Sequence, residues 1–136
     1  LILGWTAING KVEIAPILFY IGAIFWTLGY DTIYGFQDIK DDEIIGLKST
    51  SIKFKKEPYF FLYVCYSFYL ITLLVTGYLI ELNYISIMFF VIALYQMFYY
   101  QLQKLIIKNS SSCLKIFKSN NFLGLIIFLG LLMGKI

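Results

Sequence analysis

The feature that most constrains this chain is a series of long apolar stretches separated by short polar segments. A helix needs about 20 apolar residues to cross the hydrocarbon core of a bilayer, which is about 30 Å thick. Three stretches reach that length, and a fourth is shorter, with Asn120 or Asn121 as its expected N-cap. We therefore predict an all-α membrane protein with about four transmembrane helices, at residues 14–34, 59–80, 84–102 and 122–133.

The composition agrees with a lipid environment and argues against several other classes of protein. Apolar residues make up 60% of the 136 positions and charged residues only 14%. In soluble domains, about 45–50% of the residues are apolar and about 25% are charged. These values exclude a soluble globule and a disordered chain. Two cysteines and no histidine argue against a disulfide scaffold and a structural zinc site. A scattered net charge of +3 does not fit a nucleic-acid-binding protein.

The lysines predict how the chain is oriented in the membrane. All 11 basic residues are lysines, and if the spans alternate in direction, only Lys11 and Lys135 lie on one side. Basic residues concentrate in cytoplasmic loops, so we expect the other side to face the cytoplasm, or the matrix of a mitochondrion. The nine lysines on that side are Lys40, Lys48, Lys53, Lys55, Lys56, Lys104, Lys108, Lys115 and Lys118.

Five of the eight acidic residues lie between Asp31 and Glu43, directly after an apolar span. Asp31 falls within the last two turns of that span, where a carboxylate is costly and usually functional. Asp38 and Asp42 follow it by seven and eleven residues. If the helix continues, all three carboxylates project within about 40° of one direction.

Such a stripe of like charges would be stabilised by a cation. Oxygen ligands without histidine or cysteine favour a hard ion such as Mg²⁺, which uses one or two carboxylates together with substrate phosphates. Gly35 shares the carboxylate face and would leave room beside it, whereas Asp41 would point roughly 80° away. The spacing predicts a metal–phosphate platform at the membrane surface; the alternative is a solvated or ion-paired helix end.

A second polar segment, residues 46–50 (GLKST), follows an expected helix end. Lys48 is a candidate for binding phosphate as a point charge. The alternative is a lysine that only sets the topology, and we favour that interpretation for Lys53, Lys55 and Lys56. The segment is not a phosphate-binding loop of the P-loop type, because the spaced glycines are absent.

These residues resemble the second aspartate motif of the UbiA-type membrane prenyltransferases, in the 4-hydroxybenzoate polyprenyltransferase branch. The resemblance covers residues 30–34 (YDTIY), 37–42 (QDIKDD) and 45–51 (IGLKSTS). Gly35-Phe36 departs from the pattern, since Ala followed often by His or Met is usual there. A weaker match to the final helix of that branch involves Cys113, Phe117, Ser119-Asn120-Asn121 and Gly124.

The resemblance implies a fold of about nine helices around a cavity, of which residues 1–136 would be a single transmembrane domain from the C-terminal part. Residues 1–8 would then be the tail of an earlier helix, and the first aspartate motif would belong to the N-terminal half of the same enzyme. Because either half would lack metal ligands, residues 1–136 alone are expected to be inactive.

The resemblance also implies roles for individual residues. Asp38, Asp42 and Asp31 would hold Mg²⁺, and Lys48 would bind the diphosphate of a polyprenyl diphosphate. Tyr30, Tyr34 and Phe36 are candidates for lining the cavity, although 27 of the 136 residues are aromatic and most of these must serve packing.

The implied reaction is prenylation of the ring of 4-hydroxybenzoate in ubiquinone biosynthesis, in the inner membrane of a bacterium or a mitochondrion. One alternative is a related enzyme that uses homogentisate, a naphthoate or a porphyrin as acceptor. The other is a non-catalytic membrane protein or remnant that retains the motif.

Overall fold

The computed structural model describes residues 2–136, apart from the side chains at positions 2, 3, 8 and 9. Four helices are long and apolar enough to cross a membrane. The first is α2 (Ile14–Gly35) and the second is α5 (Pro58–Leu79). The third comprises α6 (Tyr84–Leu94) and its continuation η1 (Tyr95–Gln103), and the fourth is α7 (Ser110–Lys135). The all-α membrane prediction is therefore confirmed.

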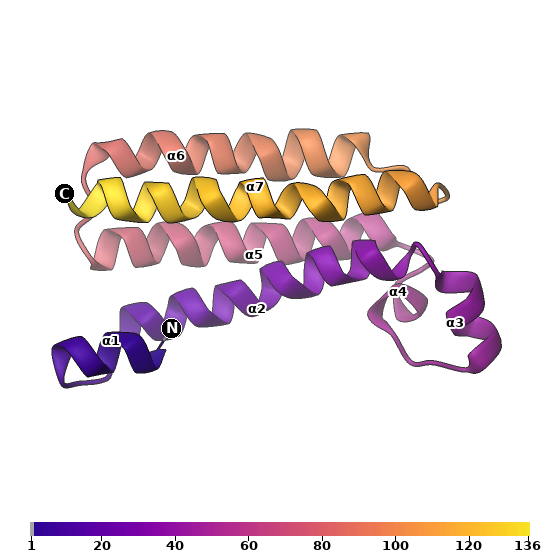
Figure 1. Cartoon of the computed structure of the whole chain (residues 1–136), viewed down its shortest axis with the longest axis horizontal. Helices are drawn as coiled ribbons and strands as arrows, with labels where there is room; N and C mark the ends of the chain where they lie inside the picture. Colours follow the sequence, from indigo (N-terminus) through magenta and orange to yellow (C-terminus); the bar gives the residue numbers. More distant parts are fainter. Residues whose placement is uncertain (1) are drawn as a thin grey trace.

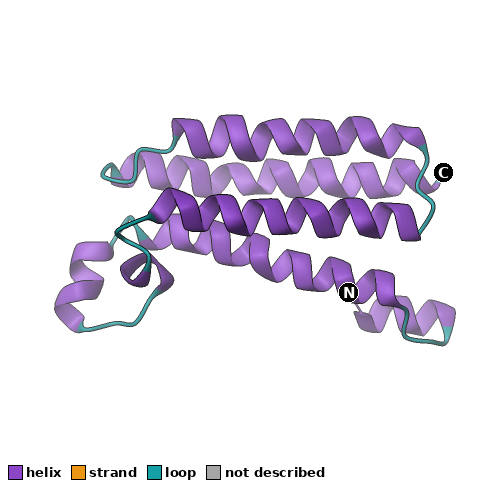
Figure 2. Ribbon diagram, turned by 180° about the vertical axis from the view of Figure 1, so that it is seen from behind, coloured by secondary structure: helices purple, strands orange, loops and turns teal. Residues whose placement is uncertain are grey.

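Three short helices complete the described chain. The helix α1 (Ile2–Asn9) precedes α2, while α3 (Ile39–Ile45) and α4 (Thr50–Lys53) lie between α2 and α5. In Figure 1, α5, α6 and α7 run side by side, and α2 crosses them obliquely, packed mainly against α5. Figure 2 shows the same arrangement from behind, with α1 and the α3–α4 region at opposite ends of α2.

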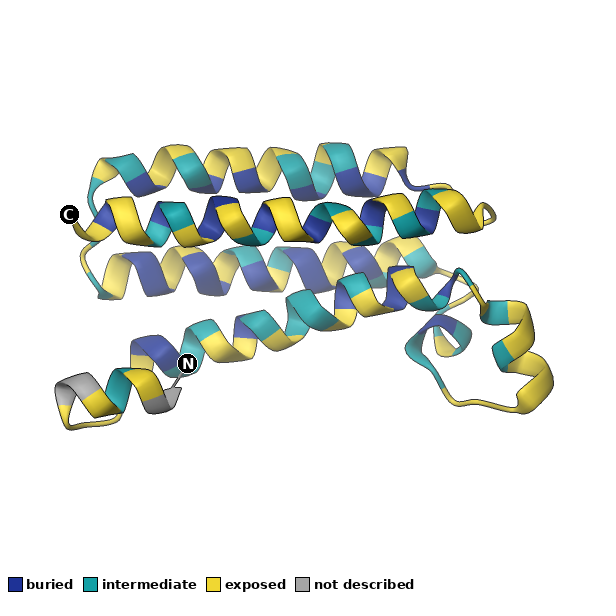
Figure 3. Cartoon of the chain, in the orientation of Figure 1, coloured by how far each residue is buried: buried dark blue, intermediate teal, exposed yellow. Residues whose placement is uncertain are grey.

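Close packing of the spans depends on small residues. A side chain at Gly22 of α2 would collide with Thr72 of α5, and a Cβ at Gly130 of α7 would lie 2.7 Å from the Cβ of Phe89. Lipid tails are as apolar as the core, so transmembrane helices associate through close packing and hydrogen bonds rather than through the hydrophobic effect. Figure 3 shows buried positions recurring along α5 and α7, whereas α3 has no buried residue.

One buried hydrogen-bond network connects all four spans. The amide of Gln101 in η1 accepts a bond from the Tyr66 hydroxyl of α5 (2.6 Å) and donates to Ser119 (3.1 Å) and Asn120 (3.2 Å) of α7. The indole of Trp26 in α2 also donates to Asn120, at 2.9 Å. Unpaired polar groups are expensive in an apolar interior, so this network fixes which helix faces meet.

The predicted start of the last helix is wrong. The helix begins at Ser110, capped by Asn109, whose side chain accepts from the Ser112 backbone N–H at 3.2 Å. Asn120 lies inside the helix, where its amide donates to the carbonyls of Ile116 and Phe117. Hydropathy missed the first turns because they are polar, although serines and lysines are compatible with a helix when they face water.

Both lysine-rich polar regions lie at the same end of the spans. The Ser110 hydroxyl donates to the Gln37 carbonyl (3.1 Å), and the Tyr59 hydroxyl donates to the Leu105 carbonyl (2.8 Å). At the other end, the Lys135 ammonium donates to the carbonyl of Ile80 at 3.0 Å. The alternation of spans on which the lysine argument depended is thus confirmed.

Candidate functional site

The helix that carries Asp31 does not continue to the other aspartates. α2 ends at Gly35, Phe36 turns into the core, and Asp38 is the N-cap of the separate helix α3. Glycine is a weak helix former, so Gly35 favours a helix end at this point. The prediction of one continuous helix with three carboxylates on a single stripe is therefore wrong.

Asp38 and Asp42 instead lie one turn apart at the start of α3. The backbone N–H groups of Asp41 and Asp42 both donate to the Asp38 carbonyl, at 3.0 Å. The Asp38 side chain makes no capping hydrogen bond, so its carboxylate remains available. Within the described part of the chain, the one acidic residue of this cluster that forms an ion pair is Glu43, with Lys55. Asp38 and Asp42 are unpaired like charges one turn apart, an arrangement that a cation would stabilise.

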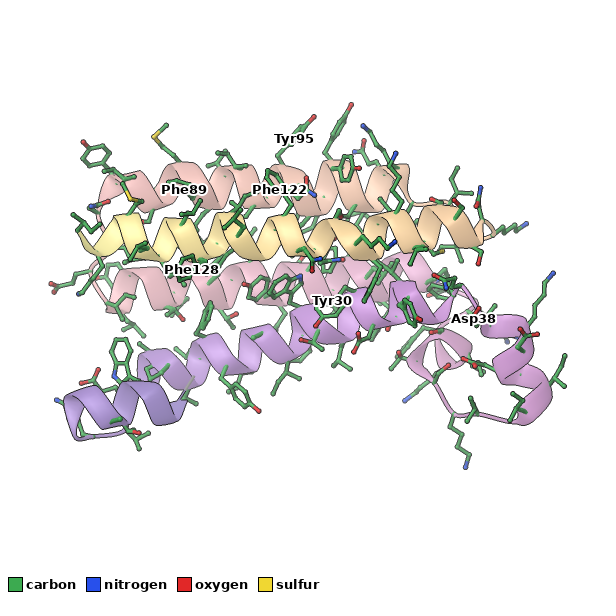
Figure 4. All side chains as sticks on the ribbon, viewed as in Figure 1. Tyr30, Asp38, Phe89, Tyr95, Phe122 and Phe128 are labelled. Carbon is green, nitrogen blue, oxygen red and sulfur yellow. The ribbon has the colours of Figure 1, made fainter. Side chains whose placement is uncertain are left out.

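The structure does not bring the three predicted metal ligands together. Asp31 is exposed and belongs to α2, whereas Asp38 is the N-cap of the separate helix α3 and Asp42 lies in its first turn. Figure 4 shows Asp38 beside the start of α3. Among residues 2–136, no group of three histidine, cysteine or acidic side chains is close enough to hold a metal ion. A metal bound here would use one or two of these carboxylates and complete its shell with phosphate or water oxygens, which suits Mg²⁺.

A cavity of about 610 Å³ lies beside these carboxylates at the lysine-rich end. The side-chain oxygen of Gln37, which belongs to this wall, is buried and has no hydrogen-bond partner. Asp38 and Phe36 are the two predicted site residues in its wall, whereas Asp42 and Lys48 are not part of it. The lining residues are Phe36, Gln37, Asp38, Ile39, Lys40, Asp41, Lys55, Ile107, Lys108 and Ser110.

The sequence reasoning missed the part of this wall that comes from the connection before α7. Ile107, Lys108 and Ser110 lie about 70 positions from the aspartates in the sequence, so no local motif links them. The lysine distribution was the only available signal, because it placed both polar segments on one side of the membrane.

The GLKST segment has a structural role beside its candidate chemical one. α3 ends at Gly46, which confirms the expected helix end, and Gly46 has the left-handed conformation (φ 78°). Ser49 caps α4 by accepting from the Ile52 N–H at 3.3 Å. The Thr50 and Thr32 hydroxyls are 2.7 Å apart, and Ser51 donates to the Thr32 carbonyl at 3.2 Å. Thr32 therefore connects the segment 30–34 to the segment 45–51 by hydrogen bonds.

Lys48 lies in an exposed depression of its own. The depression has a volume of about 340 Å³ and includes Lys53, and it shares no lining residue with the cavity beside Asp38. No carboxylate of the described chain forms an ion pair with Lys48. Its ammonium is therefore free to bind an anion, although the structure does not place it in the wall that holds Asp38.

The two tyrosines pack between spans, whereas the phenylalanine reaches the cavity. Tyr30 contacts the rings of Trp26 (centroids 5.7 Å apart) and Phe117 (5.8 Å), and Tyr34 contacts Phe117 at 4.8 Å. Tyr30 is labelled on α2 in Figure 4. Neither tyrosine lines the 610 Å³ cavity, but Phe36 does.

Gly35 does not leave room for a ligand, because Ser51 fills the space beside it. A Cβ at position 35 would collide with the Ser51 hydroxyl and lie 3.2 Å from the Ser51 Cβ. We expect Gly35→Ala to lower the free energy of unfolding by about 1–3 kcal/mol, the usual cost of overpacking. Thermal unfolding in detergent, calibrated against a denaturant series, measures this loss.

A double-mutant cycle tests the cause of that loss. Ser51→Ala removes the colliding oxygen at the cost of its bond to the Thr32 carbonyl, so Gly35→Ala/Ser51→Ala should lose less stability than the sum of the two single variants. Gly124→Ala is the matched control, because a Cβ there would meet only Trp26, at an ordinary 3.5 Å. Additive losses in the double variant would contradict the proposed contact.

Nearly the whole chain matches one family of known proteins. Residues 1–130 match the UbiA prenyltransferase family. The chain is 37% identical over 139 aligned residues to the mitochondrial 4-hydroxybenzoate polyprenyltransferase of Bos taurus, covering 99% of this chain and 36% of that protein. It is 38% identical over 128 residues to the 4-hydroxybenzoate octaprenyltransferase of Psychromonas ingrahamii, covering 93% and 43%.

A third relative is the 4-hydroxybenzoate octaprenyltransferase of Enterobacter sp.. The chain is 31% identical to it over 132 residues, which cover 97% of this chain and 45% of that protein. The chain spans 31–45% of the length of the curated relatives it matches. No solved structure matches it.

Proposed function

Because the chain belongs to the UbiA prenyltransferase family, we propose that it forms part of an enzyme that transfers a polyprenyl group from its diphosphate to the ring of 4-hydroxybenzoate. The relatives named above carry that activity in their names. The observation that carries the proposal is the Asp38 carboxylate, which lines a cavity at the lysine-rich end and is used neither in helix capping nor in an ion pair of the described residues.

The proposed ligand set is Asp38 and Asp42, with Asp31 as a further carboxylate on α2. When bound, Mg²⁺ would neutralise the diphosphate oxygens and make the diphosphate a better leaving group. Asp38 and Asp42 would hold the ion from one turn of α3, and Lys48 would add positive charge next to the phosphates. The Thr32–Thr50 contact (2.7 Å) would keep the segment that carries Lys48 at a fixed place relative to α2.

The chemistry requires no nucleophilic side chain. The carbon–oxygen bond of the allylic diphosphate breaks, the ring carbon beside the acceptor hydroxyl forms the new carbon–carbon bond, and that ring carbon then loses its proton. The protein must hold the two substrates together and keep water from the allylic cation. The apolar spans supply such surroundings, and aromatic rings such as Phe36 would stabilise a cation at close range.

We place the protein in the inner membrane of a bacterium or a mitochondrion, with the aspartate cavity on the cytoplasmic or matrix side. Since the chain spans less than half the length of its curated relatives, the proposed enzyme includes an N-terminal half that supplies the first aspartate motif. Residues 1–136 alone would then lack part of the metal site and would not catalyse the reaction.

An acceptor-competition assay tests this function. Membranes from cells that express the protein from its own gene receive a polyprenyl diphosphate, Mg²⁺ and an equimolar mixture of 4-hydroxybenzoate, homogentisate and a dihydroxynaphthoate. We expect mass spectrometry to find prenylated 4-hydroxybenzoate as the main product. Residues 1–136 expressed alone are the control and should give none.

The other outcomes are equally informative. Prenylation of homogentisate or the naphthoate in preference to 4-hydroxybenzoate would overturn the acceptor assignment but keep the family chemistry. No product with any acceptor, from protein shown to be inserted in the membrane, would favour a non-catalytic role.

A further inference from the structure

The C-terminal part of the chain is entirely without acidic residues. After Glu81 there is no aspartate or glutamate, while five lysines follow: Lys104, Lys108, Lys115, Lys118 and Lys135. Positive charge in this part is therefore balanced neither by a neighbouring carboxylate in the sequence nor by an ion pair of the described residues, since the pairs there involve Lys11 and Lys55. The ammonium groups of the five lysines are therefore available to an anion from outside these residues.

Two of these lysines share a cavity between the end of η1 and the start of α7. Its volume is about 300 Å³. It has no lining residue in common with the cavity beside Asp38, which uses Ile107, Lys108 and Ser110 of the same connection. The residues that line it are Tyr100, Lys104, Asn109, Ser111, Ser112, Lys115 and Ile116.

The Lys104 ammonium is held in place without being neutralised. It lies over the ring of Tyr100 (5.0 Å to the centroid) and near the ring of Tyr99 (5.9 Å). Cation–π contacts orient an ammonium group but leave its positive charge available to an anion.

Some polar groups that line the cavity of Lys104 and Lys115 form hydrogen bonds within the chain, and others are free to donate to a ligand. The Asn109 side-chain oxygen accepts from the Ser112 N–H, and the Ser112 hydroxyl accepts from the Ile106 N–H at 3.1 Å. These bonds fix the shape of the connection. The Asn109 amide nitrogen and the Ser111 hydroxyl donate to no other described residue, so two neutral donors accompany the two ammonium groups.

The position of the cavity favours a lipid as the source of the anion. It lies at the lysine-rich end of two membrane spans, where the exposed Tyr99 lies near Lys104 in the last turns of η1. Tyrosines of this kind mark the level of the lipid headgroups. Basic cavities between transmembrane helices on this side of a membrane bind anionic headgroups.

We propose that the cavity lined by Lys104 and Lys115 binds the phosphate of an anionic phospholipid. Lys104, placed by Tyr100, and Lys115 contact the phosphate oxygens, and Ser111 and Asn109 donate hydrogen bonds. The acyl chains then follow the exposed apolar surface of the neighbouring spans. The site is independent of the proposed prenyl transfer, since it shares no residue with the cavity beside Asp38.

Native mass spectrometry of the protein, expressed from its own gene and purified in detergent, tests the site by titration with cardiolipin. Removing two lysines that contact one phosphate should weaken binding about fivefold per lysine and about 25-fold together. We therefore expect Lys104→Gln/Lys115→Gln to raise the Kd by that factor. Lys56→Gln/Lys118→Gln removes the same charge at the same end outside the cavity and should change the Kd less than about threefold.

Three further arms define the ligand. Lys104→Arg/Lys115→Arg should retain the wild-type Kd, and phosphatidylcholine, whose headgroup has no net charge, should bind without preference for the cavity. Equal losses in both glutamine variants would overturn the proposal, because they would mean a general charge effect. Binding of inorganic phosphate that displaces cardiolipin at millimolar concentration would overturn the assignment to a lipid.

Discussion

Replacing Asp38 or Asp42 with alanine is expected to lower the rate of prenyl transfer by at least about 100-fold, since metal ligation supplies several kcal/mol of transition-state stabilisation. The fold should tolerate both changes. The Asp38 side chain forms no capping bond, and neither residue takes part in an ion pair of the described structure. Surface changes of this type usually cost less than about 0.5 kcal/mol of stability.

The assay measures turnover at saturating substrates in membranes that contain equal amounts of each variant. Resistance of the variant to extraction by alkaline carbonate shows that it is inserted in the membrane. A loss of activity without a loss of inserted protein supports a chemical role for the carboxylates. Wild-type turnover in either variant would contradict the metal assignment.

Asp41→Ala is the matched control, and it also separates two interpretations of the site. The sequence resemblance assigns the second carboxylate to Asp42, whereas the cavity wall contains Asp41 beside Asp38. We expect Asp41→Ala to retain most of the activity. If it loses as much activity as Asp38→Ala while Asp42→Ala does not, the second ligand is Asp41.

The sequence alone predicted the spans because each one depends on a local property, an apolar run long enough to cross the bilayer. The predicted ranges 14–34, 59–80 and 84–102 differ from the observed helices by one or two residues. The end of α3 at Gly46 was also predictable, since a glycine suits the left-handed conformation that ends a helix.

The errors concern features that depend on distant residues. At the break after Gly35, Ser51 occupies the space beside that glycine and Phe36 enters the core. Asn120 looked like a helix start, but its amide is buried where Trp26 and Gln101 donate to it. Nothing in the sequence indicates that these partners lie within reach.

The third span shows a similar limit. Its length and composition were predicted, but its second part, η1, is a π-helix of nine residues. π-Helical turns are rare and often occur at functional sites. Here the segment carries Gln101 into contact with Tyr66, Ser119 and Asn120. The partners of Gln101 come from other helices, so the sequence of this span alone does not reveal them.

The chemistry of the candidate site stays a prediction, whereas its geometry differs from what the spacing indicated. The residue types favour oxygen ligands and a lysine, and the resemblance implies their roles. The three carboxylates do not share one helix face because no helix runs through residues 36–38 and Asp38 begins a new one. Lys108 of the connection before α7 and Ser110, the first residue of α7, belong to the cavity wall, and no motif marks them.

Removal of divalent metal is expected to abolish prenyl transfer completely, and added Mg²⁺ should restore it. The carboxylates of Asp38 and Asp42 are hard oxygen donors, and a diphosphate supplies further oxygens for an octahedral ion. Ca²⁺ should restore activity poorly, because it requires six to eight ligands at longer distances. Membranes treated with EDTA and then titrated with each ion, with product measured by mass spectrometry, provide the test.

The same titration shows whether the aspartates act through the metal. Loss of groups that only support a metal ligand lowers metal affinity about 10–100-fold, so Asp38→Asn and Asp42→Asn should raise the Mg²⁺ concentration for half-maximal activity at least about tenfold. Gly35→Ala, which acts through Ser51, should lower stability but leave that concentration unchanged. Full activity in the presence of EDTA, or an unchanged Mg²⁺ requirement in both asparagine variants, would place the metal away from α3.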